Sequence, residues 1–187
     1  MNWYDKLNQY FPIEEMKSKE HMELLLKDKG DIYHKDEGPH HVLMYVELDD
    51  FIFIDYLFVA KESRGQGLGK KLLQQLKEKR KPIILEVEPI DYEDTDTEKR
   101  QRFYRREDFT HASKIGYRRK SLATDKVNEM EILYWAPEGE SEESVYENMK
   151  KTYNEIHTYK DKELYGKAYE DVTDVLTFQH DKGAITE

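Results

Sequence analysis

The sequence contains no cysteine among its 187 residues. Disulfide bonds, thiolate metal sites and a cysteine nucleophile are therefore excluded. It also lacks any apolar stretch close to the about 20 residues that a membrane-spanning helix needs. Residues 1–5 do not form a basic region that leads into an apolar one, as the start of a secretory signal does. We therefore expect a cytoplasmic protein without a membrane partner.

An excess of basic residues is absent too. The formal net charge is -10, and residues 138–187 hold 13 acidic residues against 6 basic ones. Such a chain repels nucleic acid and anionic membranes, so neither is an expected partner. The apolar fraction, 37%, is low, but 14 tyrosines add large apolar surfaces that can be buried. This length fits one compact domain with room for an appendage.

Apolar spacing predicts helices and strands in alternation. Residues 14–29 have the pattern of an amphipathic helix that Gly30 ends. Residues 51–59 are apolar on both faces, as a strand covered on both sides is. We also expect strands at 31–34, 41–48, 83–88, 110–113 and 130–135, a helix from the glycine-rich loop to Arg80, and a helix that carries Phe103 and Tyr104 and ends near Phe109. Strand, helix and strand from residue 51 to residue 88 form a parallel βαβ unit.

The segment Pro137-Glu138-Gly139 is typical of a linker. It divides the chain into a domain over residues 1–137 and an acidic helical extension over residues 138–187, packed on or beside that domain. Ser144 and Glu147 have the spacing of a capping box at the start of the first tail helix. A second amphipathic helix is expected over residues 164–176.

Residues 64–69 read Arg-Gly-Gln-Gly-Leu-Gly, between the buried strand and the helix. Glycine lets the backbone approach phosphate oxygens, and a helix N-terminus presents free N–H groups to an anion. The spacing excludes a Walker A loop, since Arg64 stands where its first glycine belongs and Lys71 where its hydroxyl belongs. The dinucleotide motif G-x-G-x-x-G is also absent. We therefore expect a pyrophosphate on the backbone amides of this unit; a purely structural turn is the alternative.

This loop resembles the Arg/Gln-x-x-Gly-x-Gly motif that holds acetyl-CoA in the GNAT superfamily of N-acetyltransferases. Val59, five residues before Arg64, and Leu72-Leu73 after the loop match that family too, and the resemblance covers about residues 51–109. The whole chain is also similar to an acetyltransferase type from bacilli. The resemblance implies an α/β (α+β) fold, a central mixed β-sheet flanked by helices, with acetyl-CoA as co-substrate. The residues it places at acetyl-CoA are Leu57, Phe58, Val59, Arg64, Gly65, Gln66, Gly67, Leu68, Gly69, Lys70 and Thr97.

Tyr104 lies five residues before Phe109, which resembles the family pattern Tyr-x-x-x-Gly-Phe. The resemblance implies that its hydroxyl lies near the CoA sulfur and protonates the leaving thiolate. Help from a general acid is worth about 10²–10⁴ in rate. Asp108 replaces the family's glycine, and aspartate tolerates a left-handed conformation better than most residues. The alternative is that Tyr104 merely packs beside Phe103.

Glu86 lies in the strand after the glycine helix, where the resemblance implies a base that deprotonates the attacking amine. Glu88 shares its strand face by the period of two. Two carboxylates on one face repel each other, which raises the pKa of one of them toward a useful range. A salt bridge from Glu86 to a nearby lysine or arginine is the open alternative.

Histidines at positions 40, 41 and 111 flank turns and strand ends without metal-ligand spacing to carboxylates, so we expect surface side chains and no metal. Basic residues surround the loop and the tyrosine helix, and those beside the loop are candidates for the CoA phosphates. Those beside the loop are Lys61, Arg64, Lys70 and Lys71, and those around the tyrosine helix are Lys99, Arg100, Arg102, Arg105 and Arg106.

Two features depart from the family pattern. Thr97 stands where the family has an asparagine that contacts the pantetheine arm, and residues 91–96 form an additional acidic loop. The prediction is transfer of an acetyl group from acetyl-CoA to a primary amine, on a small molecule or on a protein lysine or N-terminus, by direct attack. The acidic loop favours a cationic acceptor. The rival is a CoA-binding regulatory module, and a homodimer or a protein partner is open in either case.

Overall fold

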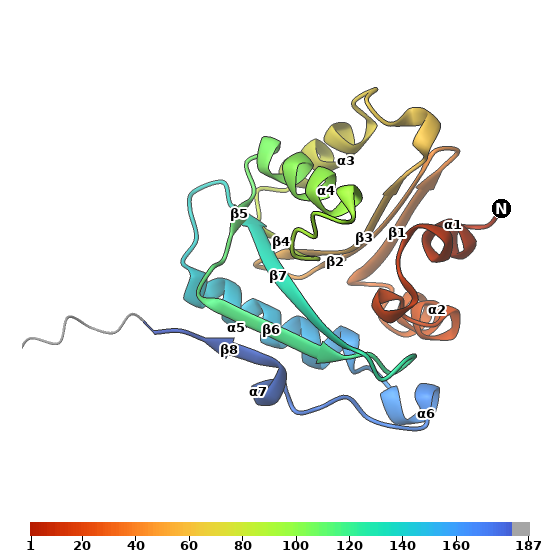
Figure 1. The fold of residues 1–187 in the computed structure, drawn as a ribbon, viewed down its shortest axis with the longest axis vertical. Coiled ribbons are helices and arrows are strands. Elements are labelled where there is room, and N and C mark those ends of the chain that lie inside the picture. Colours follow the sequence, from red (N-terminus) through yellow and green to blue (C-terminus); the bar gives the residue numbers. More distant parts are fainter. Residues whose placement is uncertain (181–187) are drawn as a thin grey trace, which may run out of the picture.

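The computed structural model describes residues 1–180, which form a sheet with helices on both of its faces (Figure 1). The strands are β1 (Tyr33–Gly38), β2 (His41–Glu47), β3 (Ile52–Val59), β4 (Ile83–Val87), β5 (Thr110–His111), β6 (Ile115–Lys120), β7 (Val127–Trp135) and β8 (Leu176–Phe178). The helices are α1 (Trp3–Tyr10), α2 (Lys19–Asp28), α3 (Leu68–Lys77), α4 (Thr95–Arg106), α5 (Glu142–Thr152), α6 (Asp161–Tyr165) and α7 (Val172–Val175). Short 3-10 turns stand at η1 (Ile13–Glu15) and η2 (Lys61–Ser63), and a π-helical turn at η3 (Tyr153–His157). The predicted mixed sheet flanked by helices is confirmed.

The strands lie in the order β1-β2-β3-β4-β7-β6-β8, with β5 beside β7. β3 and β4 run parallel, as predicted, and are joined by α3. They pair at three positions only, the last of which joins Ile54 to Leu85. β4 continues to pair with β7 as far as Val87. The carboxyl halves of β3 and β4 are therefore not bonded to each other, and this separation positions the site described below.

A β-bulge in β3, opposite Met44 and Tyr45 of β2, leaves Asp55 as an extra residue in the strand. Its carboxylate is buried and accepts hydrogen bonds from Lys17 Nζ and Tyr33 Oη, both at 2.7 Å. The bulge therefore turns a charged side chain inward at the point where β3 leaves β4.

Two hydrophobic cores cover the two faces of the sheet. Alternation along β2 shows this, because Val42, Met44 and Val46 join one core while Leu43 joins the other. On one face α3 and α4 bury Leu72, Leu73, Leu76, Tyr104 and Phe109. On the other face the N-terminal helices and the tail bury Leu7, Met22, Leu25, Val145, Met149, Tyr153 and Ile156.

The N-terminal third differs from the sequence prediction in its helices. The expected helix over residues 14–29 is wrong in its start, since α2 begins at Lys19 with Ser18 as its N-cap. The residues before it form the unexpected α1 and the turn η1. The strand expected at residues 31–34 continues to Gly38.

The later segments show two further differences. β6 lies between the strands expected at 110–113 and 130–135, where no strand was predicted, and its alternation of buried and exposed residues includes the buried Arg119. The second tail helix is wrong as one element, because Gly166 at φ +74° ends α6 and the chain continues into α7 and β8. The capping box at Ser144 is wrong as well: Ser141 is the N-cap, and its hydroxyl accepts from Ser144 N–H.

The tail packs into the body of the protein. β8 pairs with β6, and α5 and η3 contribute to the same core as α1 and α2. His21 of α2 joins the two regions, since its ring nitrogens lie 3.0 Å from Tyr165 Oη and 3.0 Å from Ile156 O. Burial lowers the pKa of His21 to about 3, so this contact is made by a neutral ring.

A pair of isoleucines tests whether the tail unfolds with the domain. Ile156 is 1% exposed in the core and Ile13 is 60% exposed. Ile156→Ala should lower the free energy of unfolding by about 2–4 kcal/mol, because it removes a buried side chain and leaves a cavity. Ile13→Ala, the same chemical change at the surface, should cost less than about 0.5 kcal/mol. Urea denaturation measures both, and a separate low-stability transition for the tail would contradict the packing.

Candidate active site

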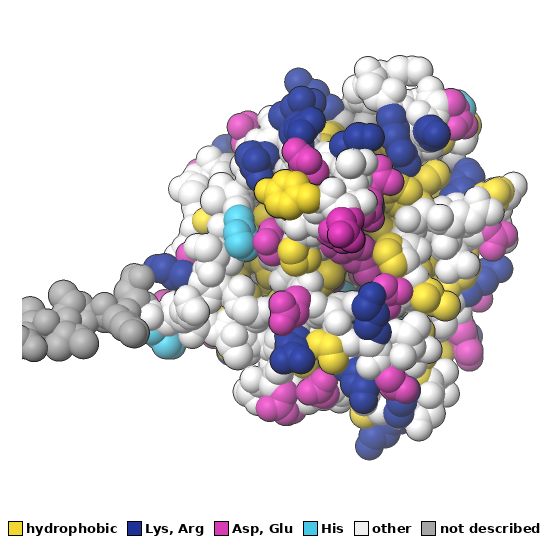
Figure 2. Space-filling model, viewed as in Figure 1, with side chains coloured by type: hydrophobic (Ala, Val, Ile, Leu, Met, Phe, Trp, Pro, Cys, Tyr) yellow, Lys and Arg dark blue, Asp and Glu magenta, His cyan; other side chains and the backbone are white. Residues whose placement is uncertain are grey.

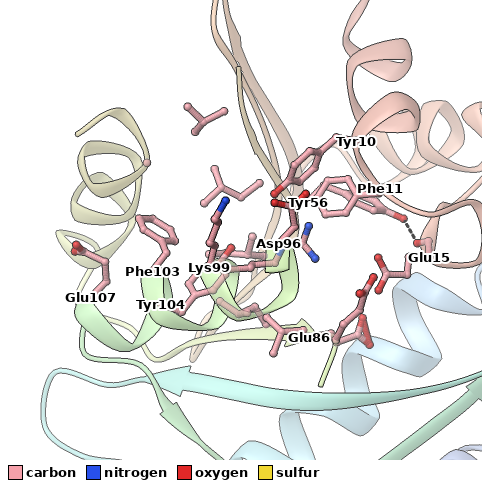
Figure 3. A pocket seen from close by; sticks show the side chains of 18 of the residues that line it. Tyr10, Phe11, Glu15, Tyr56, Glu86, Asp96, Lys99, Phe103, Tyr104 and Glu107 are labelled. Atoms are coloured by element: carbon pink, nitrogen blue, oxygen red, sulfur yellow. Dashed lines mark hydrogen bonds between the residues drawn. The ribbon is translucent and has the colours of Figure 1, made fainter. Parts of the chain in front are cut away.

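A cavity of about 450 Å³ opens where β3 and β4 separate. Its walls come from the carboxyl halves of both strands, the loop before α3, the helix α4, and residues 10–17. In Figure 3, Tyr10, Phe11 and Glu15 lie on one side of this cavity and Phe103 and Tyr104 of α4 on the other. The cavity therefore joins the predicted loop to residues 10–17, which no sequence motif had indicated as part of a site.

The glycine loop lines one end of the cavity. Gly65 and Gly67 have φ of +81° and +79°, which explains glycine at both positions. Gly67 is the N-cap of α3, and none of the side chains that the structure describes caps this helix end. Its first N–H groups therefore remain available to an anion. A Cβ at Gly69 would meet the Phe103 ring at 3.0 Å, so this glycine permits close packing of α3 on α4.

Eight of the eleven residues predicted to contact acetyl-CoA line the cavity. They are Leu57, Val59, Arg64, Gly65, Gly67, Leu68, Gly69 and Lys70. The other three do not line it. Phe58 packs on the opposite core, where its ring meets Tyr10 at 5.5 Å. Gln66 is exposed and donates to Glu62 O, and the buried Thr97 uses its hydroxyl on the backbone of Asp91 and Asp94.

Tyr104 is 6% exposed and lines the cavity between the rings of Phe103 and Phe109. Its hydroxyl makes no hydrogen bond with any residue that the structure describes. Burial raises the pKa of Tyr104, and nearby Arg100 offsets this only in part. The phenol is therefore protonated at neutral pH and can donate a hydrogen bond to a group in the cavity.

Glu86 also lines the cavity, and His157 of η3 lies behind it with Nε2 3.2 Å from the carboxylate. Burial lowers the pKa of His157 to about 4, so a neutral ring donates its Nε2–H to Glu86. Burial raises the pKa of Glu86, but its interactions with His157 and Arg119 outweigh this and hold the pKa well below the ordinary value. The expected rise in pKa from the pairing of Glu86 with Glu88 therefore does not fall on Glu86.

The carboxyl pair of the cavity is instead Glu15 with Glu88. Both line it. Burial, and then the neighbouring Glu88 carboxyl through hydrogen bonding and negative charge, raise the pKa of Glu15 to about 9, against a smaller opposing effect of Arg100. The turn η1 is fixed by Tyr56, whose hydroxyl donates to Glu15 O at 2.7 Å and accepts from Lys17 N at 2.8 Å. The sequence carried no signal for this pair, since its members lie on separate elements.

Basic side chains surround the loop end of the cavity. Arg64, Lys70, Lys99, Arg100 and Arg106 all line it, and Figure 2 shows Lys and Arg side chains gathered over α3 and α4 on this face. Tyr10 lies between two of them, with Arg64 and Arg100 each 5.1 Å from its ring centroid. The loop end is thus suited to an anionic ligand.

The three candidate histidines lie away from this cavity. His41 Nε2 is 2.9 Å from Asp36, whereas His40 is exposed. Within residues 1–180, no group of three or more histidines and acidic side chains is arranged to hold a metal ion. The same residues include no helix with the length and apolar character needed to span a bilayer.

The raised pKa of Glu15 predicts a gain in stability on its removal. The folded carboxyl keeps its proton up to about pH 9, whereas the unfolded one loses it near 4.5. The contribution of Glu15 to the free energy of unfolding is therefore fully present below pH 4.5, and it is lost progressively as the pH rises through about 9. Glu15→Gln cannot ionise, so its free energy of unfolding should exceed that of the wild type by a margin that grows from pH 5 to 9, at no more than about 1.4 kcal/mol per pH unit.

Glu14→Gln is the matched control for this prediction. Its carboxylate pairs with Lys126 at 3.0 Å, and its pKa is lowered by hydrogen bonds from its own backbone and from Lys126. Replacing it should give no gain at any pH. Chemical denaturation between pH 5 and 9 measures both variants, and a Glu15→Gln curve parallel to that of the wild type would contradict the protonated carboxyl pair.

Known proteins resemble both the sequence and the fold. The family described as acetyltransferase (GNAT) domain matches residues 28–111. The Bacillus subtilis (strain 168) protein described as "Putative acetyltransferase YjbC" is 67% identical over 176 residues, which cover 94% of this chain and 92% of the relative. A solved structure described as a "Putative acetyltransferase from GNAT family from Bacteroides thetaiotaomicron" is 26% identical with a TM-score of 0.66, over 81% of this chain and 88% of that one. The predicted family is therefore confirmed, and the chain belongs to the GNAT family of acetyltransferases.

Proposed function

We propose that this protein transfers an acetyl group from acetyl-CoA to a primary amine by direct attack. One observation carries the proposal: a single cavity brings together the N-terminus of α3, the Tyr104 phenol and a carboxyl pair, and within residues 1–180 neither the helix end nor the phenol has a side-chain partner. These are the parts that an acetyl transfer needs, namely an anion site, a donor to the leaving group and a proton acceptor.

The donor end suits acetyl-CoA, whose use the family implies. The amides of Gly65 to Lys70 would take the pyrophosphate, and Arg64 and Lys70 add positive charge. Leu57, Val59 and Leu68 offer an apolar wall for the pantetheine arm. Acetyl-CoA supplies the activated thioester carbonyl when bound. Thr97 and Gln66 have no part in this proposal, since neither lines the cavity.

The protonation states of the side chains in the cavity indicate which of them acts as the acid and which as the base. An ammonium acceptor has two protons to lose: one is taken up by the departing sulfur and one is released. Tyr104 is protonated at neutral pH and would donate to the sulfur as the carbon–sulfur bond breaks. Glu88 together with Glu15 would accept a proton from the amine as its nitrogen bonds the acetyl carbon.

Glu86 has a different role in this proposal from the base that its position implied. A carboxylate whose pKa is held far below neutrality is a weak base. It remains a fixed negative charge in the cavity wall, oriented by His157. Such a charge stabilises the cation that develops on the attacking nitrogen.

Two measurements test the activity. Calorimetry with acetyl-CoA reports binding, and release of free thiol with a library of primary amines reports transfer. We expect binding together with amine-dependent release. Binding without release across the library would favour the regulatory module instead, and absence of binding would contradict both functions.

Tyr104→Phe isolates the hydroxyl at constant shape. Turnover should fall at least about tenfold, because the leaving thiolate loses its donor, while the affinity for acetyl-CoA changes little. The matched control is Tyr92→Phe, since Tyr92 is 83% exposed and does not line the cavity. Steady-state thiol release and calorimetry give both quantities. Unchanged turnover in Tyr104→Phe would remove its role as the acid.

A further inference from the structure

Arg119 of β6 is a buried cation that has no bonded partner among residues 1–180. It is 8% exposed and lines the cavity. Its guanidinium forms no hydrogen bond and no ion pair with any described residue, and its close contacts are the rings of Tyr117 and Tyr169, 5.8 Å and 5.5 Å away. A buried guanidinium is costly unless its donors are satisfied, so one that faces a cavity unsatisfied indicates an anionic ligand.

The nearby carboxylates are already engaged. Asp55 accepts from Lys17 and Tyr33, both at 2.7 Å. Glu86 attracts Arg119 at longer range, but its bond is to His157. The five N–H donors of the guanidinium are therefore free for a group that enters the cavity.

Arg119 lies close to the turn that carries Glu15. In the sheet it is the register partner of Asn128 on β7, and Asn128 Nδ2 donates to Glu14 O at 2.9 Å. Figure 3 shows Glu15 and Glu86 on the side of the cavity away from Phe103. An anion site and the carboxyl pair therefore share the end of the cavity opposite the α4 aromatics.

The charges of this end nearly balance without a ligand. Its carboxyl groups are Glu15, Asp55, Glu86 and Glu88. Its cations are Lys17, Arg119 and Arg100, which lies between the two ends because it acts on Glu15 as well as stacking on Tyr10. With Glu15 protonated, three carboxylates face three cations. A ligand with one positive and one negative group leaves this balance intact, whereas a doubly charged phosphate does not.

We propose that the acetyl acceptor is an amino acid, held with its carboxylate on Arg119 and its amino group at Glu15 and Glu88. The planar guanidinium matches a carboxylate with two parallel hydrogen bonds. Phe11 and Tyr56, whose rings are 5.2 Å apart beside Glu15, line the cavity and give the carbon part of the acceptor an apolar wall. This inference rests on the proposed acetyl transfer and specifies its acceptor class.

Matched pairs of substrates test it. Thiol release is measured for the L-amino acids and for their primary amides, which keep the amine and lose the negative charge. The wild type should give at least one amino acid a kcat/KM about tenfold or more above that of its amide. Arg119→Gln should reduce this ratio to about twofold or less, and Arg119→Lys should give an intermediate ratio, since the charge remains but the planar fork is lost.

Two further readouts separate the outcomes. Calorimetry with acetyl-CoA should give the same affinity for Arg119→Gln as for the wild type, which shows that the variant is folded and that the donor site is intact. If the amides had the same kcat/KM as the amino acids, the amino-acid acceptor would be overturned and the proposed acetyl transfer would stand. An unchanged ratio in Arg119→Gln would also overturn it, as would release with other amines but with no amino acid. Absence of release with every amine would contradict the acetyl transfer itself.

Discussion

The site depends on the place where two parallel strands stop pairing. β3 and β4 share their last pair at Ile54 and Leu85, and the bulge at Asp55 follows immediately. The buried pair of Asp55 with Lys17 holds β3 to the N-terminal segment at this point. A buried ion pair is weak evidence for stability, because desolvation offsets its attraction. Its value here is geometric, since it brings η1 and Glu15 to the opening between the strands.

The opening also explains why the cavity has two chemically different ends. The loop end has uncapped amides and cations from α3 and α4. The opposite end has carboxyl groups from η1 and β4, and the guanidinium of Arg119 lies among these carboxyl groups. The tail completes this end from behind, because His157 bonds Glu86 from a π-helical turn, a rare feature that often occurs at functional sites. Residues far apart in the chain thus set the ionisation of one carboxylate.

Local sequence predicted the parts of this arrangement that local chemistry specifies. The glycines of residues 65–69 have the positive φ or close packing that favours glycine, and Tyr104 occurs on a helix at the cavity, as expected. Glu15, Arg119 and His157 escaped prediction because their contacts span long distances in the chain. The bond from His157 to Glu86 crosses 71 residues, and no periodicity reports a pairing of that kind. β6 escaped because its second half is three consecutive charged residues, Arg118, Arg119 and Lys120, which hide the apolar alternation of a strand although Arg119 is buried.

A crystal structure with bound CoA tests the central claim most directly, namely that the separation of β3 from β4 forms the donor site. We expect the pantetheine arm between Leu57 and Val87, with the sulfur near Tyr104 and the pyrophosphate on the amides of residues 65–70. CoA bound on another surface, with the space between Leu57 of β3 and Val87 of β4 empty, would contradict the account.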